Sequence, residues 1–191
     1  LNIHLMIMKQ DSRHNSARRS VSSRQPGSSD KHRVEVSSGG LVFKRAPEGV
    51  VFAMQMDSYG KWTFAKGHVR KGESYRKTAV REIEEELGLK GLRYIKPLGH
   101  IDIWFRDRFV FKGKLVRKFI HYFLFEAPAD AKLTPLQDTG KGEIIQDAAW
   151  IRADQVWDKS SYEDMKPVVR RALQYFEKPR RVRRRMGYKR G

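Results

Sequence analysis

The sequence predicts an α/β (α+β) domain in which helices cover the faces of a mixed central β-sheet. Segments with strand and helix patterns follow in the order strands, helix, strands, helix, which does not fit a doubly wound parallel sheet. Residues Phe119–Phe125 are largely apolar on both alternating faces, as in a central strand covered on both sides. The length of 191 residues fits one domain with tails better than two domains.

The first half of the domain is predicted to form short strands separated by turns. Glycine and proline mark turns at Pro47–Gly49 and Ser58–Gly60. The expected strands around these turns are Gly39–Phe43, Val50–Met56 and Trp62–Phe64. Lys66–Gly72 contains two glycines and is predicted to be a loop.

A helix is predicted over Ser74–Leu87, with Ser74 as its N-cap and Gly88 just after its last turn. The expected strands after it are Tyr94–Phe105, Leu115–Glu126 and Ala148–Ile151. The last helix is predicted over Tyr162–Glu177 from a stripe of apolar residues at helical spacing. Because proline is tolerated only in the first turn of a helix, Pro167 moves the expected start of this helix toward Asp164.

Charge divides the chain into three parts. The formal net charge is +18, and residues 166–191 hold eleven Lys/Arg against one Glu. We expect a disordered basic tail over residues 1–33, a folded domain over 34–177 and an Arg-rich tail over 178–191. A basic tail indicates a polyanionic partner such as RNA, the ribosome or an acidic surface.

Composition excludes several classes of protein. The chain has no cysteine, which rules out a disulfide scaffold, a zinc-thiolate site and a cysteine nucleophile. No apolar run approaches the roughly 18 residues of a membrane span, so no membrane partner is expected. The missing signal peptide and the missing cysteines favour a cytoplasmic location.

The predicted helix concentrates negative charge on one side. At about 100° per residue, Glu82, Glu85 and Glu86 share an arc of about 100°. The apolar stripe next to that arc, expected to be the buried side, consists of Val80, Ile83 and Leu87. A solvated acidic face is one interpretation, because exposed like charges cost only a few tenths of a kcal/mol. The other is a Mg²⁺ or Mn²⁺ site, since oxygen ligands without Cys or His suit these ions.

The stretch Gly67–Leu89 resembles the complete Nudix box of the Nudix hydrolase family. Its members, at the family's spacing, are Gly67, Glu73, Arg81, Glu82, Ile83, Glu85, Glu86, Gly88 and Leu89. Such a match arises by chance on the order of once in 10⁷ chains of this length. The resemblance extends over Val36–Glu177 and implies a Nudix-type α/β/α sandwich.

The resemblance implies hydrolysis of a phosphoanhydride bond in a nucleoside diphosphate linked to another group. It assigns metal binding to Glu82, Glu85, Glu86 and the carbonyl of Gly67. Glu82 is also the candidate for deprotonating the attacking water, and Glu86 is expected to be catalytic with it. Glu73 and Arg81 correspond to the ion pair that fixes the geometry of the box.

Outside the box, the family often adds a carboxylate from a loop before the last strand. Glu143 matches that position and is expected to be catalytic, with Asp147 as the competing residue.

Two further segments resemble the diadenosine polyphosphate hydrolase branch. Trp62–Val69 is similar to its lead-in, although that branch commonly has Pro where this chain has Ala65, and Lys118–Leu124 is similar to one of its strands. The similarity makes a dinucleoside polyphosphate the expected substrate. The expected substrate-binding residues are Lys66, Lys118 and Tyr122, and the other aromatic candidates for holding adenine are Tyr59, Trp104 and Phe105.

Two other functions remain open at this point. One is removal of pyrophosphate from an RNA 5′ end, which the Arg-rich tail favours because Lys and Arg contacts to phosphate drive nucleic-acid affinity. The other is a non-catalytic RNA- or ribosome-binding module on a Nudix scaffold, against which the intact Glu82, Glu85 and Glu86 argue.

Overall fold

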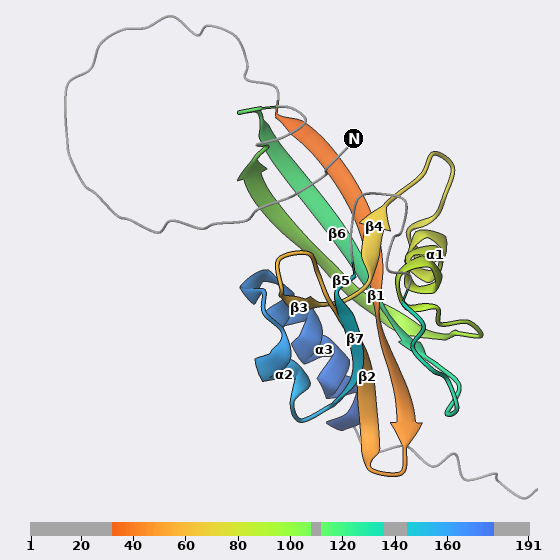
Figure 1. The fold of residues 1–191 in the computed structure, drawn as a ribbon. Coiled ribbons are helices and arrows are strands. Elements are labelled where there is room, and N and C mark those ends of the chain that lie inside the picture. Colours follow the sequence, from red (N-terminus) through yellow and green to blue (C-terminus); the bar gives the residue numbers. More distant parts are fainter. Residues whose placement is uncertain (1–31, 108–111, 136–144, 178–191) are drawn as a thin grey trace, which may run out of the picture.

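The computed structural model describes residues 32–107, 112–135 and 145–177 (Figure 1). Its strands are β1 Arg33–Ala46, β2 Gly49–Met56, β3 Trp62–Thr63, β4 Lys66–His68, β5 Arg93–Arg106, β6 Leu115–Glu126 and β7 Asp147–Arg152. Its helices are α1 Tyr75–Leu87, α2 Val156–Lys159 and α3 Lys166–Glu177, with a 3-10 turn over Glu163–Met165.

The described strands form one seven-stranded mixed sheet, which confirms the predicted fold class. Its main order is β3-β2-β1-β6-β5, with β4 paired to β1 and β7 paired to β2. β1 and β6 run parallel over eleven register pairs, from Arg33↔Val116 to Phe43↔Glu126. The other strand pairs are antiparallel.

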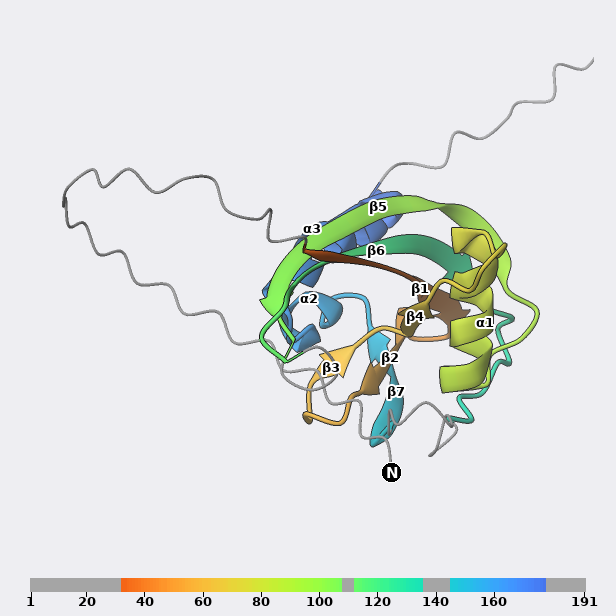
Figure 2. The same cartoon turned by 90° about the horizontal axis from the view of Figure 1, so that it is seen from above.

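β1 and β2 separate part of the way along the sheet. They pair only near their hairpin, from Val42↔Ala53 to Ala46↔Gly49. Beyond that level β4 takes the place next to β1, and β3 takes the place next to β2 (Figure 2). The segment between β3 and β4 holds the two halves together, because the backbone N–H of Gly40 donates to the carbonyl of Ala65 at 3.1 Å.

Helices pack on both faces of this sheet (Figure 1). On one face, Ala79, Ile83 and Leu87 of α1 pack with Val42 and Phe125 in a buried cluster. On the other face, a larger cluster joins α2 and α3 to alternate residues of the same strands, including Phe43, Leu124, Val156, Val168 and Ala172. The predicted double coverage of the central strand is therefore confirmed.

The helix of the box begins and ends where its sequence predicts. Ser74 caps α1 by accepting the backbone N–H of Lys77 on its side chain, at 3.3 Å. Gly88 ends the helix in the left-handed conformation, with φ of 69°, and donates its N–H to the carbonyl of Glu84. A glycine takes this conformation at little steric cost.

Two local predictions were wrong, and one helix was not predicted. Lys66–His68 is strand β4 rather than loop, because the backbone groups of Ser37–Gly39 need partners once β2 has separated from β1. α2 was not predicted, since four residues are too short to show a helical period. The last helix begins at Lys166, which places Pro167 in its first turn, where the missing N–H costs little.

The two predicted tails lie outside the described residues, except for His32 and Arg33 at the start of β1. Among the described residues, no helix combines the length and apolar character needed to cross a membrane.

Gly39→Ala is expected to lower the free energy of unfolding by about 1–3 kcal/mol or more. A Cβ at Gly39 would lie 2.2 Å from the carbonyl oxygen of Ala65, and this backbone contact cannot move aside as a flexible side chain can. Urea denaturation measures the loss. Gly49→Ala is the control, because the space around Gly49 is open and only its positive φ is strained. An unchanged stability of Gly39→Ala would show that the close approach of Gly39 does not matter.

Candidate active site

Two of the three clustered glutamates are buried. Glu82 is 1% exposed and Glu86 is 2% exposed, and both point from α1 toward β4 and the strands beneath it. The buried side of α1 therefore includes part of the acidic arc, whereas Val80, which we expected to be buried, is half-buried. Thr78 and Ala79, both fully buried on this side, are small enough to let α1 approach the sheet closely.

Glu86 lies where the two halves of the sheet separate. Its Oε2 accepts the side-chain N–H of Gln55, on β2, at 2.7 Å. The same oxygen accepts the backbone N–H of Lys66, on β4, at 3.1 Å. One buried carboxylate oxygen is thus fixed from both halves of the sheet.

Glu82 lies against the backbone of Gly67 in β4. A Cβ at Gly67 would lie 2.1 Å from the carboxyl carbon of Glu82, so no larger residue fits without moving this carboxylate. Nη1 of Arg81 also donates to Glu82, at 2.5 Å.

Arg81 connects the residues of the box. Its guanidinium donates to both oxygens of Glu73, at 2.9 and 2.8 Å, and to the backbone carbonyl of His68 at 3.1 Å. Its Nη1 also reaches Glu85 at 3.3 Å. The hydrogen bonds from Arg81 lower the pKa of Glu73 to about 2, and those to Glu73 raise the pKa of Arg81. The structure thus brings Glu73 and Arg81 together, as the resemblance implies.

The box offers oxygen donors that fit a hard divalent cation. Among residues 32–107, 112–135 and 145–177, no three acidic or histidine side chains surround a common point. Glu82 and Glu85 instead share the guanidinium of Arg81. The donor set nonetheless fits Mg²⁺ or Mn²⁺, because it consists of carboxylates beside a Gly67 backbone that has no Cβ to exclude a ligand.

The three predicted substrate-binding residues occupy different environments. Lys118 is nearly buried, with its ammonium 3.9 Å from Glu35, a carboxylate that also contacts Nε2 of His68 at 3.3 Å. The backbone N–H of Lys66 holds Glu86. Tyr122 is fully buried, and burial raises its pKa while the charge of Lys66 opposes that shift. The ring of Tyr122 thus has no exposed face on which a base could stack, and its contact with substrate stays a prediction.

Sequence reasoning missed Gln55 and Glu35. The one signal for Gln55 was a polar side chain within the otherwise apolar run Val50–Met56. The carboxylate predicted at Glu143 lies outside the described residues. Its competitor Asp147 begins β7, exposed and in register with Met56 on the strand that carries Gln55.

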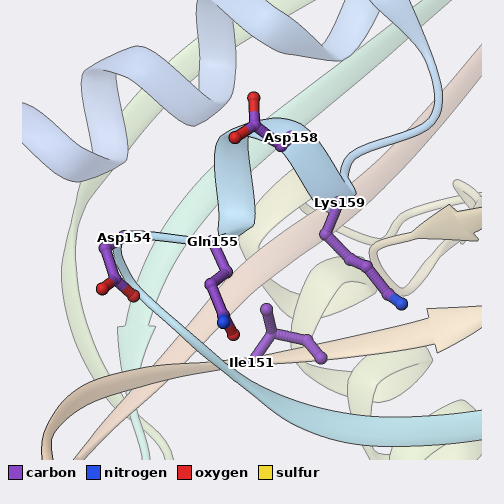
Figure 3. Close-up of a pocket in the computed structure, with 5 residues that line it drawn as sticks. All are labelled: Ile151, Asp154, Gln155, Asp158 and Lys159. Carbon is purple, nitrogen blue, oxygen red and sulfur yellow. The ribbon is translucent and has the colours of Figure 1, made fainter.

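A separate open hollow of about 420 Å³ lies beside α2 (Figure 3). It is lined by Ile151, Asp154, Gln155, Asp158 and Lys159, and it includes no residue of the box.

Comparisons with known proteins agree with the resemblance seen in the sequence. A family model described as "NUDIX domain" matches residues 36–172. A Mycobacterium tuberculosis protein assigned as mutator protein MutT4 is 29% identical over 75% of this chain, and the match spans 56% of that relative's length. The asymmetrical bis(5'-nucleosyl)-tetraphosphatase of Rattus norvegicus is 28% identical over 62% of this chain and 74% of its own.

A solved structure of a C. elegans Ap4A hydrolase binary complex shares the fold. It superposes with a TM-score of 0.60 at 20% identity, covering 75% of this chain and 98% of its own.

Glu73→Gln is expected to destabilise the protein in a pH-dependent way. The folded-state pKa of Glu73, about 2, lies below the ordinary value of 4.5. The ionised carboxylate therefore contributes stability above pH 4.5, and this contribution is lost as the pH falls toward 2. Denaturation of both proteins between pH 7 and 2.5 should show a difference that shrinks below pH 4.5. Glu84→Gln, on the exposed side of α1, controls for loss of a carboxylate; a pH-independent difference would contradict the assignment.

Gln55→Leu is expected to weaken Mn²⁺ binding about 10- to 100-fold, the usual cost of losing a residue that orients a metal ligand. The substitution removes the donor that fixes Oε2 of Glu86. Titration of free Mn²⁺ by electron paramagnetic resonance measures affinity without a substrate. Gln146→Leu is the matched control, because Gln146 is exposed and its side chain bonds the carbonyl of Ser58. Unchanged Mn²⁺ affinity in Gln55→Leu would rule out this role.

Proposed function

Because the chain belongs to the NUDIX domain family, we propose that it is a divalent-metal-dependent pyrophosphohydrolase. It cleaves a phosphoanhydride bond in a nucleoside diphosphate linked to another group. One observation carries this proposal: the complete box folds so that Glu82, Glu85 and Glu86 lie on one helix beside the Gly67 backbone.

Glu82, Glu85, Glu86 and the carbonyl of Gly67 would hold the cation. A divalent ion held there would neutralise charge on the diphosphate and would lower the pKa of a bound water. Phosphoryl transfer depends mainly on positioning and on neutralising charge. In this proposal Gln55 and the Lys66 N–H hold Glu86 still, and a carboxylate oxygen of Glu82 accepts the proton of the attacking water.

The proposed substrate is a dinucleoside polyphosphate. The ammonium groups of Lys66 and Lys118 would bind phosphates beyond the two held at the box. Lys118 is nearly buried beside Glu35 and is therefore held in place, unlike a mobile surface lysine. Similarity to the Rattus norvegicus tetraphosphatase supports the same choice.

Removal of pyrophosphate from an RNA 5′ end is the second candidate. The observation in its favour is the charge of residues 178–191, which hold eight Lys/Arg and no acidic residue. Contacts from such a segment to RNA phosphates would raise affinity and make it salt-dependent.

Glu86→Gln is expected to reduce hydrolysis by at least about 100-fold, because it replaces a ligand carboxylate with an amide of the same shape. The assay panel, with Mg²⁺ or Mn²⁺, contains diadenosine tetra- and hexaphosphate, ADP-ribose and a 5′-triphosphorylated RNA. Glu84→Gln, at an exposed position two residues earlier on α1, should retain activity. Wild-type turnover of RNA alone would favour the second candidate. Inactivity on the whole panel, or an active Glu86→Gln, would contradict the proposal.

A further inference from the structure

One face of the β1-β6-β5 sheet carries α1 and continues beyond it as an open surface. In Figure 1 the start of β1, the end of β5 and the start of β6 extend past this helix. On β6 the side chains of this face are Arg117, Phe119, His121, Phe123 and Phe125, and the last of these packs in the cluster beneath α1.

The exposed large apolar side chains of the described residues all gather on this face. They are Val34, Tyr75, Tyr94, Trp104 and Leu115. Register places Val34 and Trp104 on either side of Arg117, and ring contacts place Tyr75 on His121 and Tyr94 on Phe123. Because monomeric proteins rarely gather exposed apolar groups in one place, this face has the character of a binding surface.

The middle of the face is a continuous series of flat groups, which we call the aromatic ladder. Its members, in spatial order, are His32, Trp104, Arg117, Phe119, His100, His121 and Tyr75. The ring centroids of His32 and Trp104 are 4.9 Å apart. The Arg117 guanidinium lies 5.1 Å from the Trp104 centroid and 4.6 Å from that of Phe119.

The other end of the aromatic ladder is also stacked. His100 lies 5.9 Å from Phe119 and 5.3 Å from His121. Tyr75 stacks nearly parallel on His121, with centroids 4.0 Å apart at an angle of 14°. Asp102 fixes the guanidinium of Arg117 from the side with hydrogen bonds as short as 2.7 Å. The surface is therefore built of planar groups whose orientations are largely set before any partner arrives.

We propose that the aromatic ladder is a docking surface for single-stranded RNA. Unpaired bases stack on aromatic rings, on histidine and on arginine planes, and this stacking tolerates any base sequence. The ladder supplies all three kinds of plane side by side. This docking is separate from the hydrolase reaction proposed above, since no member of the ladder is among the residues proposed to hold the cation or to bind the polyphosphate.

Charge favours RNA over a second copy of the chain. The described basic residues around the ladder are Arg76, beside Tyr94, and Arg106, Lys112 and Lys114, where β5 ends and β6 begins. Asp102 and Arg117, both on this face, are paired with each other and neutralise each other. With a net charge of +18, the chain attracts a polyanion and repels its own copies.

The experiment measures binding of the full chain to a fluorescein-labelled 12-nucleotide single-stranded RNA by anisotropy at two salt concentrations. Tyr75→Ala and Trp104→Ala remove rings that are 42% and 48% exposed, so the fold should be preserved. Each is expected to weaken binding about 5- to 150-fold, the range for loss of one stacked base. The salt dependence should stay unchanged, because no phosphate contact is lost.

Conservative variants separate stacking from loss of structure. Tyr75→Phe and Trp104→Phe keep a ring and should restore most of the affinity. RNA should quench tryptophan fluorescence in the wild type, and Trp104→Phe should remove much of that quenching while still binding.

Three results would overturn the proposal. If the alanine variants bind RNA as tightly as the wild type, the ladder does not bind RNA and any binding belongs to the basic tails. If the same variants weaken binding of a double-stranded RNA to the same extent, base stacking is excluded. A wild-type dimer in sedimentation that the alanine variants dissociate, without any change in RNA affinity, would assign the face to a second copy.

Discussion

Glu82 and Glu86 are buried where α1 meets β4, and a buried carboxylate is costly unless charge and hydrogen bonds compensate it. Arg81 supplies the charge for Glu82, whereas the Gln55 side chain and the Lys66 N–H supply donors for Glu86. These donors come from a helix and two strands that are far apart in the sequence. The position of α1 on the sheet is therefore fixed by the need to satisfy two carboxylates as well as by apolar packing.

The separation of β1 from β2 makes this arrangement possible. If the two strands paired along their full length, the backbone N–H of Lys66 and the side chain of Gln55 could not both reach Glu86. The separation exposes the edge of β1, and β4 covers it from Ser37 to Gly39. Glycine at 39 and 67 lets the β4 segment approach β1 on one side and Glu82 on the other. The same residues that complete the sheet thus bring backbone and carboxylate oxygens together.

The parts of this arrangement that depend on local sequence could be predicted, and those set by distant contacts could not. Ser74 and Gly88 mark the ends of α1, and the apolar run Phe119–Phe125 marks β6, because each signal lies within or next to its own element. The apolar stripe of α1 predicted only part of the buried side: Ile83 and Leu87 are buried, but Glu82 and Glu86 are buried as well. An analysis of periodicity treats a glutamate as exposed. In the folded chain, Arg81 compensates the burial of Glu82 and Gln55 compensates that of Glu86.

Arg81 has a second consequence for the proposed metal site. Its Nη1 contacts Glu82 and Glu85, so a cation bound by these carboxylates would compete with the guanidinium for the same oxygens. Arg81 would not be left unpaired in that exchange, because Glu73 accepts from its Nε and Nη2 and the carbonyl of His68 accepts from Nη2. Glu73 is well suited to that task, since its pKa of about 2 keeps it ionised at any pH near neutrality. The ion pair therefore stabilises the box and also leaves the glutamates available to a stronger positive charge.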